Sequence, residues 1–172
     1  MTKVLIVVDM LKDFMMEGGA LFLGKEALKI IPIIKAKIEQ ARKEGVMVIF
    51  LCDSHDENDL EFKRFPKHAV RNTSGACVID DLVIGPNDFI ILKTRYSGFY
   101  NTNLAQLLQE HKVAEAELTG VCTHICVMDT AGGLANRDIQ VLIDRQAVAD
   151  FNQEAAEAAL ERMRSLYGAV LV

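Results

Sequence analysis

The stretch KVLIVVD, residues 3–9, is a continuous apolar run rich in Val and Ile that ends in a carboxylate. β-Branched residues favour strands, and a strand that is apolar on both faces is typical of a parallel sheet covered by helices on both sides. The other runs of this kind are VMVIFLCD (46–53), DFIILK (88–93), AELTGV (116–121), IQVLID (139–144) and AVLV (169–172).

Segments with helical periodicity alternate with these runs, at 25–44, 101–112, 123–137 and 152–168. Gly45 ends the first of them, and Pro32 either lies in its first turns or kinks it. The alternation, without an internal repeat or a linker, predicts one doubly wound α/β domain that spans residues 1–172.

Composition excludes several classes of protein. The 172 residues are 51% hydrophobic and 25% charged, which is typical of a globular chain. The net charge is −5 and no basic block occurs, so a nucleic-acid partner is disfavoured. No apolar run approaches the roughly 18 residues of a membrane helix, and because Asp9 interrupts the N-terminal run we expect it to be a first strand and not a signal peptide. We expect a cytoplasmic protein with a small-molecule substrate and no membrane partner; a homo-oligomer is compatible with the sequence.

Reactive side chains follow the ends of the predicted strands. Asp9, Asp53 and Lys93 end three of them, and a fourth leads into Cys122 and Cys126. Ligands of doubly wound sheets bind beyond the carboxyl ends of the strands, so a thiol, a carboxylate and an ammonium at this edge could form a nucleophile with its base. Strands that merely end in polar residues at the solvent would give the same pattern.

Two cysteines lie four residues apart in GVCTHICVMDTAGG (120–133), with His124 between them. A metal site, a disulfide, a redox pair and a catalytic thiol are the alternatives. A cytoplasmic chain rarely carries structural disulfides, and no C-x-x-C motif occurs. We interpret Cys52 and Cys77 as small buried apolar residues.

The region 54–87 is too long and irregular for an ordinary connection, which indicates either function or disorder. It contains His55, Glu61 and His68, and it follows Asp53 directly. Two imidazoles with one or two carboxylates suit zinc, iron or manganese. Two surface histidines in an acidic loop would show the same spacing.

Five ordered motifs resemble those of the nicotinamidases within the isochorismatase-like cysteine hydrolase superfamily. They are VVDMLKDF, CDSHDENDLEFKRFPKHAVRNTSGA, KTRYSGFYNTNL, LTGVCTHICVMDTA and RQAVADFNQE, and together they cover nearly the whole chain. The resemblance implies a six-stranded parallel sheet with helices on both faces.

The resemblance also implies a catalytic triad of Asp9, Lys93 and Cys126. Cys126 is the implied nucleophile, and at the start of a helix the helix dipole should lower its pKa. Asp9 is the implied general base, and Lys93 the cation that favours the thiolate. A cis peptide between Val121 and Cys122 would aim the N–H of Cys122, with that of Cys126, at the oxyanion. Asp13 is expected to hydrogen-bond a loop, and His124 to have no catalytic role.

One divalent metal ion, zinc in preference to iron or manganese, is also implied by the resemblance. Asp53, His55 and His68 match its ligands, and Glu61 falls where some members place another. In nicotinamidases this ion takes the pyridine nitrogen, and aromatic residues enclose the ring; Phe14, Phe65 and Tyr96 match that pocket. Ser54 replaces a tryptophan found in other members.

These correspondences predict a cysteine amidase that converts nicotinamide to nicotinate and ammonia through a thioester, and that also accepts pyrazinamide. One alternative is another C–N hydrolase of the superfamily, with a ureido or carbamoyl substrate. The other is a catalytically silent binding protein on the same fold.

Overall fold

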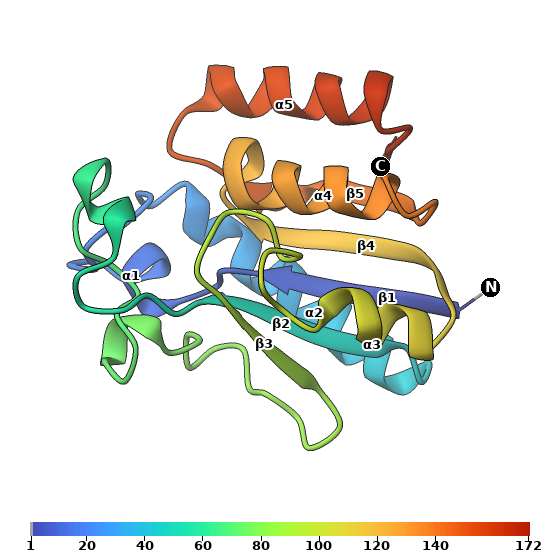
Figure 1. The fold of residues 1–172 in the computed structure, drawn as a ribbon, viewed down its shortest axis with the longest axis horizontal. Helices are drawn as coiled ribbons and strands as arrows, with labels where there is room; N and C mark the ends of the chain where they lie inside the picture. The colour runs from blue at the N-terminus through green and yellow to red at the C-terminus, as the bar shows by residue number, and fades with distance from the viewer. Residues whose placement is uncertain (1) are drawn as a thin grey trace.

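The computed structural model describes residues 2–172, and its centre is a six-stranded parallel sheet in the order β3-β2-β1-β4-β5-β6 (Figure 1). All five strand pairs are parallel, as predicted. The strands are β1 (Thr2–Val8), β2 (Met47–Asp53), β3 (Phe89–Lys93), β4 (Val113–Val121), β5 (Gln140–Ala149) and β6 (Val170–Leu171).

The longer helices lie where periodicity predicts them, although their ends differ. They are α2 (Ile30–Lys43), α3 (Leu104–Glu110), α4 (Met128–Ala135) and α5 (Gln153–Leu166), and a single turn, α1 (Lys12–Met15), follows β1. Pro32 lies in the first turn of α2, where a missing N–H removes no helical hydrogen bond. A π-helical turn, Thr123–Val127, precedes α4. No helix within residues 2–172 combines the length and the apolar character needed to cross a bilayer.

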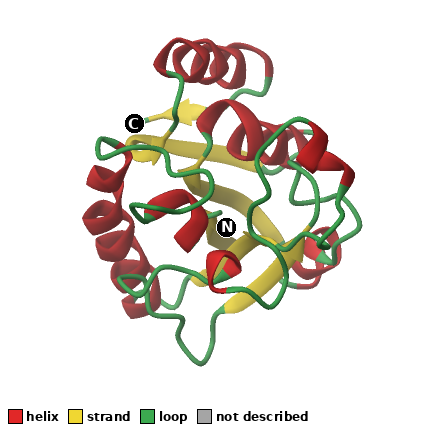
Figure 2. Cartoon of the chain, turned by 90° about the vertical axis from the view of Figure 1, so that its left-hand side faces the viewer, coloured by secondary structure: helices red, strands yellow, loops and turns green. Residues whose placement is uncertain are grey.

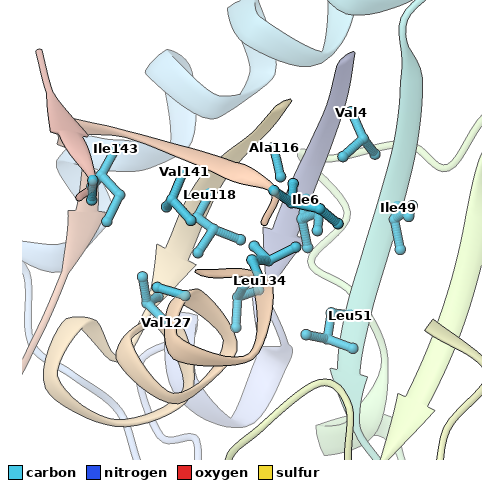
Figure 3. Packing of buried hydrophobic residues seen from close by; sticks show 14 of the residues in the cluster. Val4, Ile6, Ile49, Leu51, Ala116, Leu118, Val127, Leu134, Val141 and Ile143 are labelled. Atoms are coloured by element: carbon cyan, nitrogen blue, oxygen red, sulfur yellow. The ribbon is translucent and has the colours of Figure 1, made fainter. Parts of the chain in front are cut away.

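Helices cover both faces of the sheet (Figure 2). Alternate side chains of β1 point to opposite faces, so Leu5 and Val7 pack beside α2, while Val4, Ile6 and Val8 pack on the other side. On that other side, side chains of β1, β2, β4 and β5 meet α3, α4 and α5; Figure 3 shows the part of this core around Leu134 of α4.

Two strands are longer than the apolar runs that predicted them. β4 begins at Val113, and β5 continues to Ala149, beyond the expected end at Ile143–Asp144. The second half of β5 begins with the half-exposed or exposed polar residues Asp144, Arg145 and Gln146, and its register against β4 shifts between Leu118 and Gly120. A search for apolar runs does not find a strand of this kind.

The strand order places a switch point between β1 and β4. From β1 the chain adds β2 and then β3 on one side, and it adds β4, β5 and β6 on the other. In sheets of this order, ligands bind in the crevice outside the carboxyl ends of the two central strands. The arrowhead of β1 points to the left in Figure 1, and Figure 2 views the molecule from that side. The region 54–87 contributes only short 3₁₀ turns and isolated bridges there.

Candidate active site

Asp9 directly follows β1 and turns back toward β2. Its φ of 49° lies in the left-handed region, and its N–H donates to the carbonyl of Leu51 at 2.8 Å. Its Oδ1 accepts a hydrogen bond from the backbone N–H of Asp53 at 2.7 Å. The carboxylate is therefore fixed at the switch point and is almost fully buried.

Lys93, the last residue of β3, is one of the most deeply buried side chains of the protein. Its Nζ lies 2.8 Å from Oδ2 of Asp9 and 2.5 Å from Oδ1 of Asp53. The same Nζ donates to Sγ of Cys126 at 3.4 Å. A buried ammonium requires such partners, since an unpaired charge in the core is costly. One cation therefore joins both carboxylates to the thiol.

The π-helical turn after β4 delivers Cys126 to this cation. The N–H groups of Ile125 and Val127 both donate to the carbonyl of Cys122, at 3.1 and 3.2 Å, and Oγ1 of Thr123 binds the carbonyl of Ala149 at 3.1 Å. One carboxylate oxygen of Asp9, one of Asp53 and Sγ of Cys126 all lie within 4.8 Å of one another.

Gly120 permits the close approach of β4 to β1 just before this turn. Its φ is +102°, and a Cβ at this position would lie 2.0 Å from the carbonyl oxygen of Val8, so no other residue fits. The Val121–Cys122 peptide that follows is cis, as the resemblance implies.

Burial is the largest influence on the pKa values of the candidate catalytic groups. Burial first, and then the charge of Asp53, raise the pKa of Asp9 to about 6, although Lys93 opposes them. Burial also raises the pKa of Cys126 well above that of an ordinary thiol, against the effect of Lys93. The expectation that the helix dipole leaves Cys126 with a lowered pKa is therefore wrong, because desolvation outweighs it. The resting pair is a thiol beside a carboxylate that can take its proton.

Three further side chains, those of His55, Glu61 and His68, converge with Asp53 next to this cluster. Nε2 of His55 lies 3.6 Å from Oδ2 of Asp53, and Nε2 of His68 lies 4.0 Å from the same oxygen. The Nε2 atom of His68 is also 3.9 Å from Oε1 of Glu61. All four side chains are buried, although buried carboxylates and imidazoles normally have bonded partners.

The donor set fits a divalent metal ion. Within residues 2–172, Nε2 of His55 and Oε2 of Glu61 are buried without a hydrogen-bond partner, as expected of atoms that face a ligand. On the other side of the imidazoles, Nδ1 of His55 contacts Oδ2 of Asp59 at 3.2 Å, and Nδ1 of His68 contacts the carbonyl of Pro66 at 2.7 Å. Imidazoles that bind metals usually have such partners. Two nitrogens and two carboxylates suit zinc, iron or manganese.

A cavity of about 430 Å³ opens onto both clusters. Phe14, Phe65 and Tyr96, the predicted pocket residues, all line it, and the rings of Phe65 and Tyr96 lie edge to face with centroids 6.5 Å apart. The segment 19–23 and Phe151 line it as well, and the sequence did not reveal either of them.

Asp13 has the loop-binding role that was expected of it. Its Oδ2 accepts the N–H of Ala69 at 2.8 Å, and its Oδ1 accepts that of Ala20 at 3.2 Å, which ties the segment 19–23 to the metal-site loop. Cys52 is buried as expected, but Cys77 is exposed, and its Sγ donates to the carbonyl of Thr73 at 3.6 Å. The interpretation of Cys77 as a core residue is wrong, because it lies in an irregular surface loop.

Comparison with known proteins identifies the family of this chain. Residues 3–172 match the isochorismatase domain. The chain belongs to the isochorismatase family. An isochorismatase family protein of Bacillus subtilis, PncA, is 35% identical over 98% of both chains. The crystal structure of the nicotinamidase PncA from that organism has a TM-score of 0.94 at 36% identity, over 100% of this chain and 99% of the other.

Two other solved members of the isochorismatase family are similar over nearly their whole length. A pyrazinamidase of Pyrococcus horikoshii in complex with zinc has a TM-score of 0.94 at 35% identity, over 100% of this chain and 99% of the other. An N-carbamoylsarcosine amidase of Thermoplasma acidophilum has a TM-score of 0.91 at 30% identity, over 99% and 95%. This isochorismatase-family chain is an amidohydrolase, an enzyme that acts on an amide C–N bond.

Proposed function

We propose that this protein hydrolyses nicotinamide to nicotinate and ammonia, and pyrazinamide by the same route, as part of the cytoplasmic recovery of the pyridine ring. The observation that carries the proposal is the contact of Nζ of Lys93 with both Asp9 and Cys126 at an apolar cavity. A thiol, a base and a fixed cation in one place constitute an activated nucleophile.

The reaction begins when Asp9 takes the proton of the Cys126 thiol as the sulfur attacks the carboxamide carbon. A C–S bond forms, and the carbonyl oxygen takes up the negative charge opposite the N–H groups of Cys122 and Cys126. The C–N bond then breaks as Asp9 returns the proton to the nitrogen, and ammonia leaves a thioester. Lys93 keeps its charge throughout and holds Asp9 in reach of the sulfur.

Water completes the cycle. Asp9 takes a proton from the attacking water, the C–S bond breaks, and the sulfur leaves as a thiolate that recovers its proton from Asp9. The product is a carboxylic acid, which loses its proton to the surrounding water and leaves as the carboxylate. A divalent ion held by Asp53, His55, Glu61 and His68 would supply a Lewis-acid site for a ring nitrogen of the substrate.

The cavity favours a neutral aromatic amide. Phe14, Phe65 and Tyr96 provide flat apolar walls, and no Arg or Lys is found among the described residues that line the cavity. The charged side chains that line it are carboxylates, such as Asp53 and Glu61. Nicotinamide and pyrazinamide carry no charge, whereas N-carbamoylsarcosine and ureidoacrylate each bring a carboxylate that would find no Arg or Lys side chain along this lining.

The likeness to an N-carbamoylsarcosine amidase supports a second candidate, the hydrolysis of a carbamoyl or ureido substrate. Ammonia release from nicotinamide, pyrazinamide, ureidoacrylate and N-carbamoylsarcosine separates the two. The protein should be tested after loading with zinc, iron or manganese in turn. We expect turnover of the two neutral ring amides. Turnover of only the two anionic substrates would establish the second candidate instead, and turnover of none would contradict both.

A further inference from the structure

Asp59 contacts two of the four candidate metal ligands without joining them. Its Oδ2 lies 3.2 Å from Nδ1 of His55, which is four residues earlier in the chain. Its Oδ1 accepts the backbone N–H of Glu61 at 2.8 Å and so caps the 3₁₀ turn Leu60–Lys63 that carries Glu61. One carboxylate therefore fixes the ring of one ligand and the backbone of another.

Arg95 fixes Asp59 in turn. Its NH1 lies 3.0 Å from both carboxylate oxygens of Asp59 and also donates to the carbonyl of Thr94. The Asp59 side chain is only 8% exposed, whereas that of Arg95 is 34% exposed, so the carboxylate is the buried member of the pair. Both oxygens of Asp59 already have partners, which distinguishes it from Glu61, whose Oε2 has none within residues 2–172. One ligand atom each of His55, Asp59 and Glu61 lie within 4.8 Å of one another, but because both oxygens of Asp59 are already bonded we assign it a supporting role and not that of a ligand.

The contact with Asp59 decides which nitrogen of His55 is free. A neutral imidazole has one N–H and one lone pair, and a carboxylate beside Nδ1 places the proton there. The lone pair is then on Nε2, which is fully buried and lies 3.6 Å from Oδ2 of Asp53, the atom it would share an ion with. The ring is held in the tautomer and orientation that metal binding needs.

We propose that Asp59, held by Arg95, is the positioning residue of the metal site and sets its affinity by orienting His55 and Glu61 together. The inference rests on the metal ion of the proposed function. It does not require nicotinamide to be the substrate, because it concerns binding of the ion alone.

The experiment measures zinc affinity by competition with a chromophoric chelator. Asp59→Asn keeps the shape of the side chain, but its single oxygen cannot serve both Glu61 and His55. We expect it to weaken zinc binding by about 10–100-fold. Asp56→Asn is the matched control, since the side chain of this aspartate of the same loop is 75% exposed and, within residues 2–172, forms an ion pair only with Arg71, at 3.3 Å. It should bind zinc as the wild type does.

A second variant and a second probe separate positioning from general damage. Arg95→Gln keeps the Asp59 carboxylate but removes the guanidinium that holds it. It should also weaken zinc binding, by a smaller factor than Asp59→Asn does. Cobalt(II) reports on coordination: at saturation its visible absorption should change in Asp59→Asn and stay unchanged in Asp56→Asn. A structural defect remote from the ion would leave the cobalt spectrum unchanged, and it would not produce zinc affinities that fall in the order wild type, Arg95→Gln, Asp59→Asn.

Equal zinc affinity in wild type and a folded Asp59→Asn protein would overturn the inference, and so would an equal loss in Asp56→Asn. Absence of zinc, iron and manganese binding in the wild type would overturn it together with the metal part of the proposed function. Failure to hydrolyse nicotinamide by a protein that binds zinc, and loses affinity in Asp59→Asn, would overturn the proposed substrate alone.

Discussion

Replacement of Cys126 and of Cys122 by alanine should have unequal effects, although the two thiols are equally buried, at 7% exposure each. Sγ of Cys126 contacts Nζ of Lys93 at 3.4 Å and lies in the group that contains Asp9. Cys122 packs in the core on the α2 side of the sheet and lines the cavity wall. The proposed role of position 122 is its backbone N–H, which alanine retains.

The magnitudes follow from what each substitution removes. Cys126→Ala deletes the nucleophile, so kcat on nicotinamide should fall by at least about 10³-fold, or about 4 kcal/mol in barrier height. Cys122→Ala deletes one buried sulfur, which should cost about 1 kcal/mol of unfolding free energy. Its kcat should stay within about tenfold of wild type, a barrier change below about 1.4 kcal/mol.

Steady-state ammonia release gives the rates, and urea unfolding shows that each variant is folded. Acid quenching during turnover, followed by intact-mass measurement, should reveal a nicotinoyl adduct on the wild type and on Cys122→Ala, but not on Cys126→Ala. Equal inactivation of two folded variants, or an adduct on Cys126→Ala, would show that the nucleophile is misassigned.

Two lysines with acidic partners give further predictions. Lys93→Met leaves Asp9 and Asp53 buried without their cation and should lower the unfolding free energy in urea by about 3–5 kcal/mol; a loss below about 1 kcal/mol would contradict a buried charge pair. Lys37 of α2 lies 2.8 Å from Asp144 of β5 and, although burial opposes it, holds the pKa of Asp144 below its ordinary value. A lowered carboxyl pKa stabilises the fold at pH values above the pKa of the unfolded chain, so Lys37→Met should lower the free energy of unfolding by about 1 kcal/mol at pH 7. This difference from wild type should shrink below about pH 4, where Asp144 becomes protonated. An equal difference at pH 3 would contradict the assignment of this ion pair.

The sequence predicts those parts of the molecule that a local pattern encodes. Each strand contains a short apolar run, and the polar residues that end the runs of β1, β2 and β3 mark the carboxyl edge of the sheet, so Asp9, Asp53 and Lys93 could be placed together before the structure was known. The exceptions have a physical cause. The second half of β5 is polar on its exposed face, and so it carries no apolar signal.

Other features depend on contacts between residues far apart in the chain. Asp59 and Arg95 are 36 positions apart, and only the fold shows that their side chains meet. The carboxylate four residues after His55 was a visible signal, but spacing alone cannot distinguish a ligand from its support. The sequence also could not predict that the segment 19–23 lines the cavity. Its position depends on Asp13, which accepts hydrogen bonds from the N–H groups of both Ala20 and the distant Ala69.

Asp53 joins the two halves of the site, and this limits what its replacement can reveal. Its N–H donates to Asp9 at 2.7 Å, its Oδ1 contacts Lys93 at 2.5 Å, and its Oδ2 lies 3.6 Å from Nε2 of His55. A change at Asp53 therefore disturbs the base, the cation and the metal ligands at once. Cys126 and His68 touch only one half each. Loss of chemistry without loss of zinc binding in Cys126→Ala, and the reverse in His68→Ala, would separate the two halves that Asp53 connects.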